Sequence, residues 1–444
     1  MAKGKKGSGV SRGPSPITAV TVCGYKSLVS PQTVEIRPLT ILAGANSSGK
    51  SSIMQPLLLM KQTLAEPSDP GAILLEGPNV KCTSVSDLLP RHPSPDCKNG
   101  FWVRLELDSG MKVTTYYVKA NGGFRIQEMR YQEPGDKEVA WREEMKHDDI
   151  APRLPKWIQS IIKDISKKAK WRIVRRRCIL ELGYVEGKRA IGLELSPAMA
   201  AVANLERIIH LPGLRGNPEP TYPIRSVGRA FPGQFHDYVA SVIEKWKAAG
   251  ARELNTLKKD LQRLNLTWKV DTRHVTDTRV EILVGRLPHS AVGGGHDLVN
   301  IAHVGFGVSQ ALPVMAALIA AAPGQIVYIE QPEIHLHPKA QTAMADLLVA
   351  AANRGVRVVA ETHSSLLLLA IQSAVARGQI PPDKVKLHWF QRDEKGNTKV
   401  ASADLDEQGR FGDWPEDFGK TELDAQDDYL NAAEKQHANG RHAK

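Results

Sequence analysis

Residues 44–51 read Gly44-Ala45-Asn46-Ser47-Ser48-Gly49-Lys50-Ser51, the phosphate-binding-loop pattern G-x-x-x-x-G-K-[ST]. An apolar run at 39–43 precedes the loop and is typical of a strand, and a helix-like stretch at 51–64 follows it. Glycines let such a loop turn its backbone N–H groups onto phosphate oxygens. The following helix N-terminus adds the positive end of a dipole. Strand, loop and helix in this order predict an α/β nucleotide-binding domain.

Each side chain of the loop has a predicted task. Lys50 is placed to meet the β- and γ-phosphates, and the hydroxyl of Ser51 is placed to meet Mg²⁺. The other predicted nucleotide contacts are Gly44, Asn46, Ser47, Ser48, Gly49 and Ser52.

A second motif ends an apolar strand at 326–329 with Glu330, as a Walker B strand ends. A carboxylate at this strand tip holds the hydration shell of Mg²⁺. A further strand at 356–360 leads to His363, and a histidine there can contact the γ-phosphate or the attacking water. The predicted catalytic residues are Glu330, Gln331, Glu333 and His363.

Between the phosphate loop and Walker B, residues 304–310 open an apolar helix with glycines and a serine. They form a second anion-binding feature, with Gly307, Ser309 and Gln310 as predicted nucleotide contacts. One triphosphate does not need two such features in one chain. Two chains packed head to tail would use both, each closing the site of the other.

Composition sets the broader class. The chain has 444 residues, 42% of them apolar and 24% charged, which predicts a globular protein with two or three domain-sized units. The net charge of +11 is compatible with a nucleic-acid partner. The four cysteines form no CxxC pair, and no apolar run reaches membrane-spanning length. We therefore expect a cytoplasmic protein with no membrane partner.

Patterning along the chain predicts five parts. They are a disordered basic arm at 1–16, the first part of an ATPase head at 17–135, an inserted α-rich or mixed lobe at 136–290, the second part of the head at 291–422 and a polar tail at 423–444. Alternation predicts strands at 101–107 and 113–118. Helices are expected over 140–178 and 236–266.

The motif order resembles the ABC-type ATPase heads of the SMC and RecF class, and more closely the OLD-like AAA ATPases common in bacterial anti-phage defence. The segments that carry the resemblance lie at 17–27, 210–215, 304–310, 330–338 and 414–415. It implies an ABC-type P-loop head with ATP and Mg²⁺ as cofactors. It also implies roles for Lys50 and Ser51 on triphosphate and metal, Ser309 on the γ-phosphate across a dimer, Glu330 on Mg²⁺ and His363 as a switch. Arg215 lies in a segment typical of the group and has no assigned role.

Gln331 departs from that pattern, since many ABC ATPases have a glutamate there to orient the attacking water. An amide can hold a water but cannot accept its proton. We expect slow hydrolysis and a long-lived ATP-bound dimer, unless Glu333 or His363 substitutes.

Three functions stay open at this stage. The first is an ATP-dependent switch whose head-to-tail dimer controls a separate effector, a nuclease, in anti-phage defence. The second is a RecF-like ATPase that clamps DNA, and the third is an ATP-sensing scaffold that does not hydrolyse. We expect no nuclease site in this chain, because OLD nucleases carry theirs in a C-terminal domain and only about 80 residues follow His363. A basic cluster at 163–177 around Trp171 fits either contact with nucleic acid or a solvated face.

Overall fold

The computed structural model describes residues 14–162, 170–186, 189–287, 297–412 and 427–430. The predicted arm and tail lie outside these ranges except for residues 14–16 and 427–430. Lys163, Lys167 and Lys168 of the basic cluster and the segment at 414–415 also lie outside them. Within the described ranges, no helix has the length and apolar character that crossing a membrane requires.

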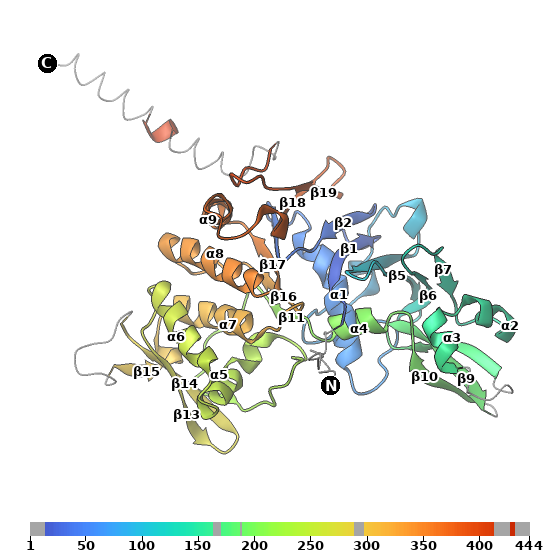
Figure 1. The fold of residues 1–444 in the computed structure, drawn as a ribbon, viewed down its shortest axis with the longest axis horizontal. Coiled ribbons are helices and arrows are strands. Elements are labelled where there is room, and N and C mark those ends of the chain that lie inside the picture. Colours follow the sequence, from blue (N-terminus) through green and yellow to red (C-terminus); the bar gives the residue numbers. More distant parts are fainter. Residues whose placement is uncertain (1–13, 163–169, 187–188, 288–296, 413–426, 431–444) are drawn as a thin grey trace, which may run out of the picture.

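A six-stranded central sheet carries the phosphate loop (Figure 1). In spatial order it consists of β11 (Ile209–Leu211), β16 (Ile326–Glu330), β17 (Arg357–Thr362), β3 (Leu39–Gly44), β18 (Val385–Arg392) and β19 (Thr398–Ala403). The first five strands are parallel and β19 is antiparallel. The strand of the phosphate loop thus lies between two strands from the last third of the sequence.

Helices cover both faces of this sheet (Figure 1). One face packs on α1 (Lys50–Ala65), and the other packs on α7 (Phe306–Ala320), α8 (Pro338–Asn353) and α9 (Ser365–Ala376). Neighbouring sheet residues alternate between the two cores, so that Ile41 faces the α7–α9 side and Leu42 the α1 side. The predicted α/β fold class is therefore confirmed.

A second, antiparallel sheet lies on the far side of α1. Its strands in order are β2 (Gln32–Glu35), β1 (Ile17–Cys23), β4 (Gly100–Leu107), β5 (Lys112–Ala120), β6 (Gly123–Gln132) and β7 (Val139–Trp141). The strands predicted at 101–107 and 113–118 are confirmed as β4 and β5. Because α1 is enclosed between two sheets, almost all its residues are buried.

The middle of the chain builds two separate additions. The first contains α2 (His147–Ile150), α3 (Lys156–Ile162), α4 (Met199–Leu205) and a sheet of β8 (Lys170–Arg176), β9 (Ile179–Glu186) and β10 (Arg189–Leu195). The second contains α5 (Val239–Ala248), α6 (Arg252–Arg263) and a sheet of β12 (Tyr222–Pro223), β13 (Val270–Thr276), β14 (Arg279–Gly285) and β15 (Leu298–Asn300).

Of the two helical segments predicted in this region, one is confirmed and the other is largely wrong. The helices expected over 236–266 are confirmed as α5 and α6. The helical prediction for 140–178 is wrong in large part, because only short helices form there and β8 pairs with β9. Between the two additions, β11 returns to the central sheet and pairs with β16, so the range 136–290 also contributes to the ATPase sheet.

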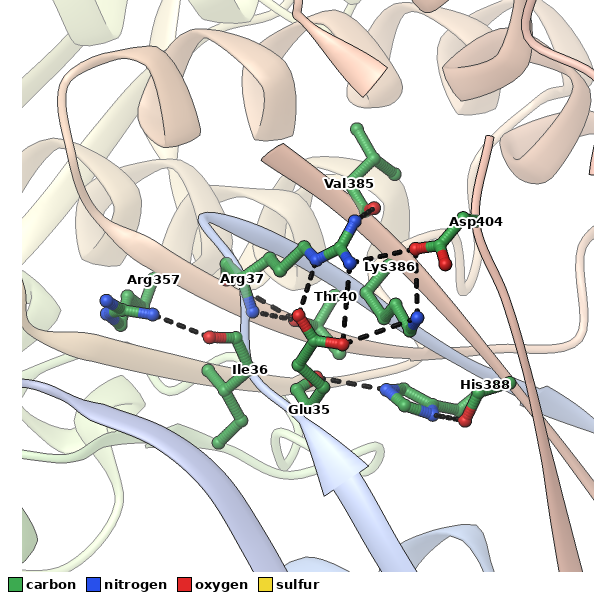
Figure 2. Close-up of polar contacts among 10 residues, drawn as sticks. Glu35, Ile36, Arg37, Thr40, Arg357, Val385, Lys386, His388 and Asp404 are labelled. Carbon is green, nitrogen blue, oxygen red and sulfur yellow. Dashed lines mark hydrogen bonds and ion pairs between the residues drawn. The ribbon is translucent and has the colours of Figure 1, made fainter. Parts of the chain in front are cut away.

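A polar cluster fastens the end of β2 to the far edge of the central sheet (Figure 2). Arg37 pairs through Nε with Glu35 Oε1 at 2.7 Å and through Nη2 with Asp404 Oδ1 at 2.8 Å. Lys386 Nζ lies 2.9 Å from Asp404 Oδ1 and 3.3 Å from Glu35 Oε2. The cluster joins the end of β2 to β18 and to the residue that follows β19.

Candidate nucleotide site

The phosphate loop has the backbone shape that its glycines allow. Gly44 has φ 144° and Gly49 has φ 103°. A Cβ at Gly44 would lie 2.3 Å from the carbonyl oxygen of Phe390, and one at Gly49 would lie 2.3 Å from Thr398 Oγ1. Only glycine fits both the left-handed backbone and this close approach.

The loop also leaves donors free for an anion. Helix α1 begins with no side-chain cap on Gly49 and no acidic residue in its first turn. The Ser48 hydroxyl is buried without a hydrogen-bond partner among the described residues. Lys50 Nζ donates to the loop carbonyls of Gly44 at 3.0 Å and Ala45 at 2.8 Å, and burial lowers the pKa of Lys50. These features fit the phosphates of a nucleotide with its Mg²⁺.

The loop lines a cavity of about 650 Å³. Residues from four other segments complete its wall, namely Pro212, Gly213, Leu214, Glu330, Gln331, Glu361, His363 and Arg392. The structure thus brings the predicted Glu330, Gln331 and His363 to residues 47–52. Glu333, Ser309 and Gln310 are not part of this lining.

Glu330 is held by the segment at 210–213. Its Oε1 lies 3.2 Å from His210 Nε2, and its Oε2 accepts from the Gly213 N–H at 3.2 Å. Asn79 Nδ2 lies 3.0 Å from His210 Nδ1, which makes Nδ1 the acceptor and places the ring proton on Nε2. Burial alone would raise the pKa of Glu330, but the hydrogen bonds from His210 and Gly213 lower it below its ordinary value.

Glu361 is a site residue that the sequence reasoning missed. Its Oε2 accepts from Ser51 Oγ at 2.8 Å, and the phenol of Tyr328 donates to its Oε1. Burial, with the charge of Glu330 beside it, raises the pKa of Glu361 to about 7. One signal could have found it, since Glu361 ends the strand beside Walker B and stands opposite Glu330 in register.

The remaining predicted catalytic residues lie on two neighbouring segments, Gln331 and Glu333 in the turn after β16 and His363 directly after β17. Gln331 has φ 49°, and its N–H donates to the Glu361 carbonyl at 2.8 Å. Glu333 Oε1 accepts from Thr362 Oγ1 at 2.8 Å and from the His363 N–H at 3.0 Å. Burial raises the pKa of Glu333 and lowers that of half-buried His363. Glu333 therefore positions the backbone of His363, and its catalytic role stays a prediction.

The residues of the second anion-binding feature lie at the start of α7, and one of them, Ser309, lines a different cavity. Ser309 Oγ donates to the Phe306 carbonyl at 3.0 Å, and Gln310 Nε2 donates to the Gly216 carbonyl at 2.9 Å. Gly307 lies against the loop after Walker B, where an added Cβ would be 3.3 Å from the His335 carbonyl oxygen. Ser309 lines a cavity of about 560 Å³ together with Arg215.

Arg215 connects this helix to Walker B. Its Nη2 donates to the carbonyls of Glu330 at 2.7 Å and Gln331 at 3.1 Å, and its Nη1 donates to the Gln310 carbonyl at 3.3 Å. The side chain is buried, which lowers its pKa to about 10. Arg215 has no role predicted from the sequence, and the structure shows it joining α7 to the end of β16.

Three arginines in the described part of the basic cluster are engaged within the chain, whereas Lys170 and Arg172 are exposed. Arg175 makes two hydrogen bonds to Asp69 at 2.7 and 2.8 Å. Arg176 pairs with Glu194 at 3.0 Å, and Arg177 donates to the Leu64 carbonyl. These arginines stabilise the β8–β9 hairpin against its neighbours, and nucleic-acid contact here stays a prediction.

Comparison with known proteins places this chain in a family. A family model described as AAA domain, putative AbiEii toxin, Type IV TA system, matches residues 136–370, more than half of the chain. This match contains β11, α7, Walker B and His363. A second model, described as a protein of unknown function (DUF3696), matches residues 380–418. No curated protein matches the chain.

Three solved structures similar to this chain are heads of SMC proteins. An SMC head bound to the C-winged helix domain of ScpA is 13% identical with a TM-score of 0.47, covering 88% of this chain and 98% of that one. An SMC head domain from Thermotoga maritima is 12% identical with a TM-score of 0.38, covering 88% and 100%. An SMC head from Pyrococcus furiosus, bound to the C-terminal domain of ScpA, is 12% identical with a TM-score of 0.41, covering 88% and 96%.

Proposed function

Since this chain belongs to the AAA-domain family described as putative AbiEii toxin of a type IV toxin–antitoxin system, we propose that it is an ATP-driven switch of the ABC type. ATP binding closes a head-to-tail dimer, and the closed dimer controls a separate effector. The observation that carries the proposal is the single cavity shared by the phosphate loop, Glu330, Gln331, Glu361 and His363.

The binding step follows from the loop. Bound Mg²⁺ supplies positive charge that neutralises the phosphates. The Lys50 ammonium exchanges its two loop carbonyls for phosphate oxygens, while the N–H groups at the start of α1 and the Ser48 hydroxyl receive the rest. Ser51 and a strand-end carboxylate hold the metal.

The pairing step follows from the position of Ser309. Ser309 lines the same cavity as Arg215, and the phosphate-loop cavity of the same chain does not include it. Two large apolar side chains stand exposed at the two features, Leu214 (84% exposed) beside the phosphate loop and Phe306 (49%) at the start of α7. A second copy that brings α7 onto the phosphate loop would cover both.

The last part of the proposal is that the effector is a nuclease in anti-phage defence. The resemblance stated above to the OLD-like AAA ATPases supports it, and the matching family model is described as a putative toxin of a toxin–antitoxin system. The DNA-clamping alternative gains no support from Arg175, Arg176 and Arg177, whose charges are already paired or hydrogen-bonded within the chain. If the effector model holds, phage protection in cells should be lost whenever ATP binding or dimer closure is lost.

Two variants test the switch. Lys50→Ala removes the main cation of the loop, and the loss of a charged hydrogen bond costs about 1.5–3 kcal/mol, so ATP affinity should fall about 10- to 100-fold. Lys395→Ala, which removes an exposed lysine from the β18–β19 turn, is its control. Wild-type ATP affinity and turnover in Lys50→Ala would remove the phosphate-loop assignment.

Ser309→Arg tests pairing separately. The arginine should leave ATP binding by one chain intact and abolish the ATP-induced dimer, measured by light scattering with and without nucleotide. Thr342→Arg adds the same side chain to an exposed position on α8 and is the matched control. An unchanged dimer and unchanged turnover in Ser309→Arg would show that this helix does not complete the partner's site.

A further inference from the structure

Two carboxylates stand side by side at the end of the central sheet, and they have different partners. Glu330 and Glu361 end the neighbouring parallel strands β16 and β17 and are opposite each other in register. Both line the cavity of the phosphate loop. Only one of them touches the loop: Glu361 Oε2 accepts from Ser51 Oγ at 2.8 Å.

We infer that Glu361, rather than Glu330 of the Walker B strand, is the carboxylate that acts with Ser51 on the Mg²⁺ of bound nucleotide. The inference rests on the proposed nucleotide-binding function and assigns one residue within it. It transfers to Glu361 the metal role that the sequence pattern gives to Glu330.

Both carboxylate oxygens of Glu330 already have hydrogen-bond partners in the segment at 210–213. Its Oε1 receives the Nε2 proton of His210, and its Oε2 receives the N–H of Gly213. His210 is itself fixed by Asn79 at 3.0 Å and stacks on Tyr328 with ring centroids 5.4 Å apart. Both oxygens of Glu330 thus hold the segment at 210–213 against Walker B. Glu330 is a positioning residue in this arrangement.

Glu361, in contrast, contacts the predicted metal ligand directly. The hydroxyl of Ser51, the predicted metal ligand, points at its Oε2, and the phenol of Tyr328 fixes its Oε1. A carboxylate hydrogen-bonded to a metal-binding group orients that group and holds negative charge beside the cation. Mg²⁺ sites on nucleotides use one or two carboxylates together with substrate phosphates and water. Glu361 and Ser51 fit this donor set.

Glu361→Gln tests the negative charge of this side chain separately from its hydrogen bonds. The amide oxygen of glutamine still accepts from Ser51 or Tyr328, so the loop keeps its shape while the negative charge is lost. Glu330→Gln is the matched variant on the neighbouring strand. The readout is the affinity of the full-length protein for a non-hydrolysable ATP analogue, measured by titration calorimetry in Mg²⁺ and again in EDTA.

We expect Mg²⁺ to increase the affinity of the wild type and of Glu330→Gln by a similar factor. In Glu361→Gln that factor should shrink about 10- to 100-fold, as for the loss of a partner of a metal ligand, with affinity in EDTA no lower than wild type. Equal Mg²⁺ dependence in Glu361→Gln and wild type would overturn the inference. Loss of the Mg²⁺ dependence in Glu330→Gln alone would also overturn the inference.

Two further results separate this inference from the proposed function. A wild type that binds no nucleotide with or without Mg²⁺ would overturn both, whereas normal Mg²⁺ dependence in Glu361→Gln overturns only the role of Glu361. If Glu361→Gln does not fold, Tyr328→Phe decides. It removes the phenol that fixes Oε1 and should lower the Mg²⁺ factor severalfold, and an unchanged factor would overturn the inference.

Discussion

Single side chains set the chemistry that this cavity can perform. Gln331 lines it together with Lys50 and His363, and its backbone is fixed by the N–H bond to Glu361. A neutral amide can orient a water molecule but cannot take its proton. The cavity is therefore better equipped to hold nucleotide than to turn it over.

Gln331→Glu should raise the rate of hydrolysis if neither Glu333 nor His363 already acts as the base, because it places a carboxylate where the wild type has a neutral amide. General-base catalysis contributes about 10²–10⁴-fold, so single-turnover assays should show an increase of at least about tenfold. Gln408→Glu, on an exposed turn, adds the same charge outside the cavity and is the control. An unchanged rate in Gln331→Glu, with activity abolished in Glu333→Gln or Glu330→Gln, would identify one of those carboxylates as the base and contradict the Walker B register.

The residues of the site that could be predicted from the sequence are those that lie next to one another along the chain. The phosphate loop could be found because eight consecutive residues carry the whole pattern. Glu361, His210 and Arg215 could not be placed in the same way. Glu361 reaches the cavity through the pairing of β17 with β16. His210 and Arg215 come from a distant segment and contact the side chain and the backbone carbonyl of Glu330. Sequence spacing along one element contains no information on which strands become neighbours.

Helix α1 shows how an element can be predicted while its surroundings are not. The pattern predicts a helix after the loop, and the structure buries that helix on all sides between two sheets. Lys61 is thereby enclosed, with its Nζ donating to the Gly233 carbonyl at 2.9 Å. Burial lowers the pKa of Lys61 to about 7.

Lys61→Met should stabilise the protein at pH 7. Between pH 7 and 10.5 the unfolded chain binds a proton that the folded chain releases, so the free energy of unfolding of the wild type rises with pH across this window. Methionine removes a cost of a few kcal/mol at neutral pH and should also flatten that rise. Thermal melts from pH 6.5 to 9.5 measure both effects. Lys339→Met, at an exposed position of α8, is the control. A lower Tm for Lys61→Met would show that the bond to Gly233 outweighs the cost of burying the ammonium.

At the scale of the whole molecule, segments from the two ends of the chain, around β2 and around β18 and β19, meet in the cluster of Figure 2. His388 on β18 belongs to it, since its Nε2 donates to the Glu35 carbonyl at 3.0 Å and its Nδ1 accepts from Ser402 Oγ at 2.7 Å. Burial, aided by the charges of Lys386 and Arg37, lowers the pKa of His388 to about 4.

The free energy of unfolding should therefore fall between pH 6.5 and 4. In that window the unfolded chain binds a proton on His388 that the folded chain does not, so stability decreases as pH falls, by up to about 3 kcal/mol. Urea unfolding at pH 7 and pH 5 measures the change. His388→Gln should reduce it, whereas His92→Gln, at an exposed position, should not. The same pH dependence in His388→Gln and wild type would show that other groups cause it.

The overall architecture could be predicted at the two ends of the chain and not in the middle. Motifs with alternating strands and helices predict the parallel sheet. In the range 136–290 only the segment at 210–215 resembles a known family, and it does not predict the folds of the two additions on either side of it. The three-residue strand β11 is too short to show a pattern of its own, yet it inserts this region into the head. Its place is determined by pairing with β16, which only the folded chain reveals.

The order of strands in the central sheet also has a consequence for biosynthesis. Strand β3 emerges early from the ribosome, but both of its sheet neighbours, β17 and β18, emerge at the end of synthesis. At about 5–20 residues per second, β3 remains without those partners for roughly 15 to 60 s. During this time its apolar faces and unpaired backbone are open to wrong partners, so the nascent chain depends on chaperones or on the earlier folding of the antiparallel sheet to protect its phosphate-loop strand.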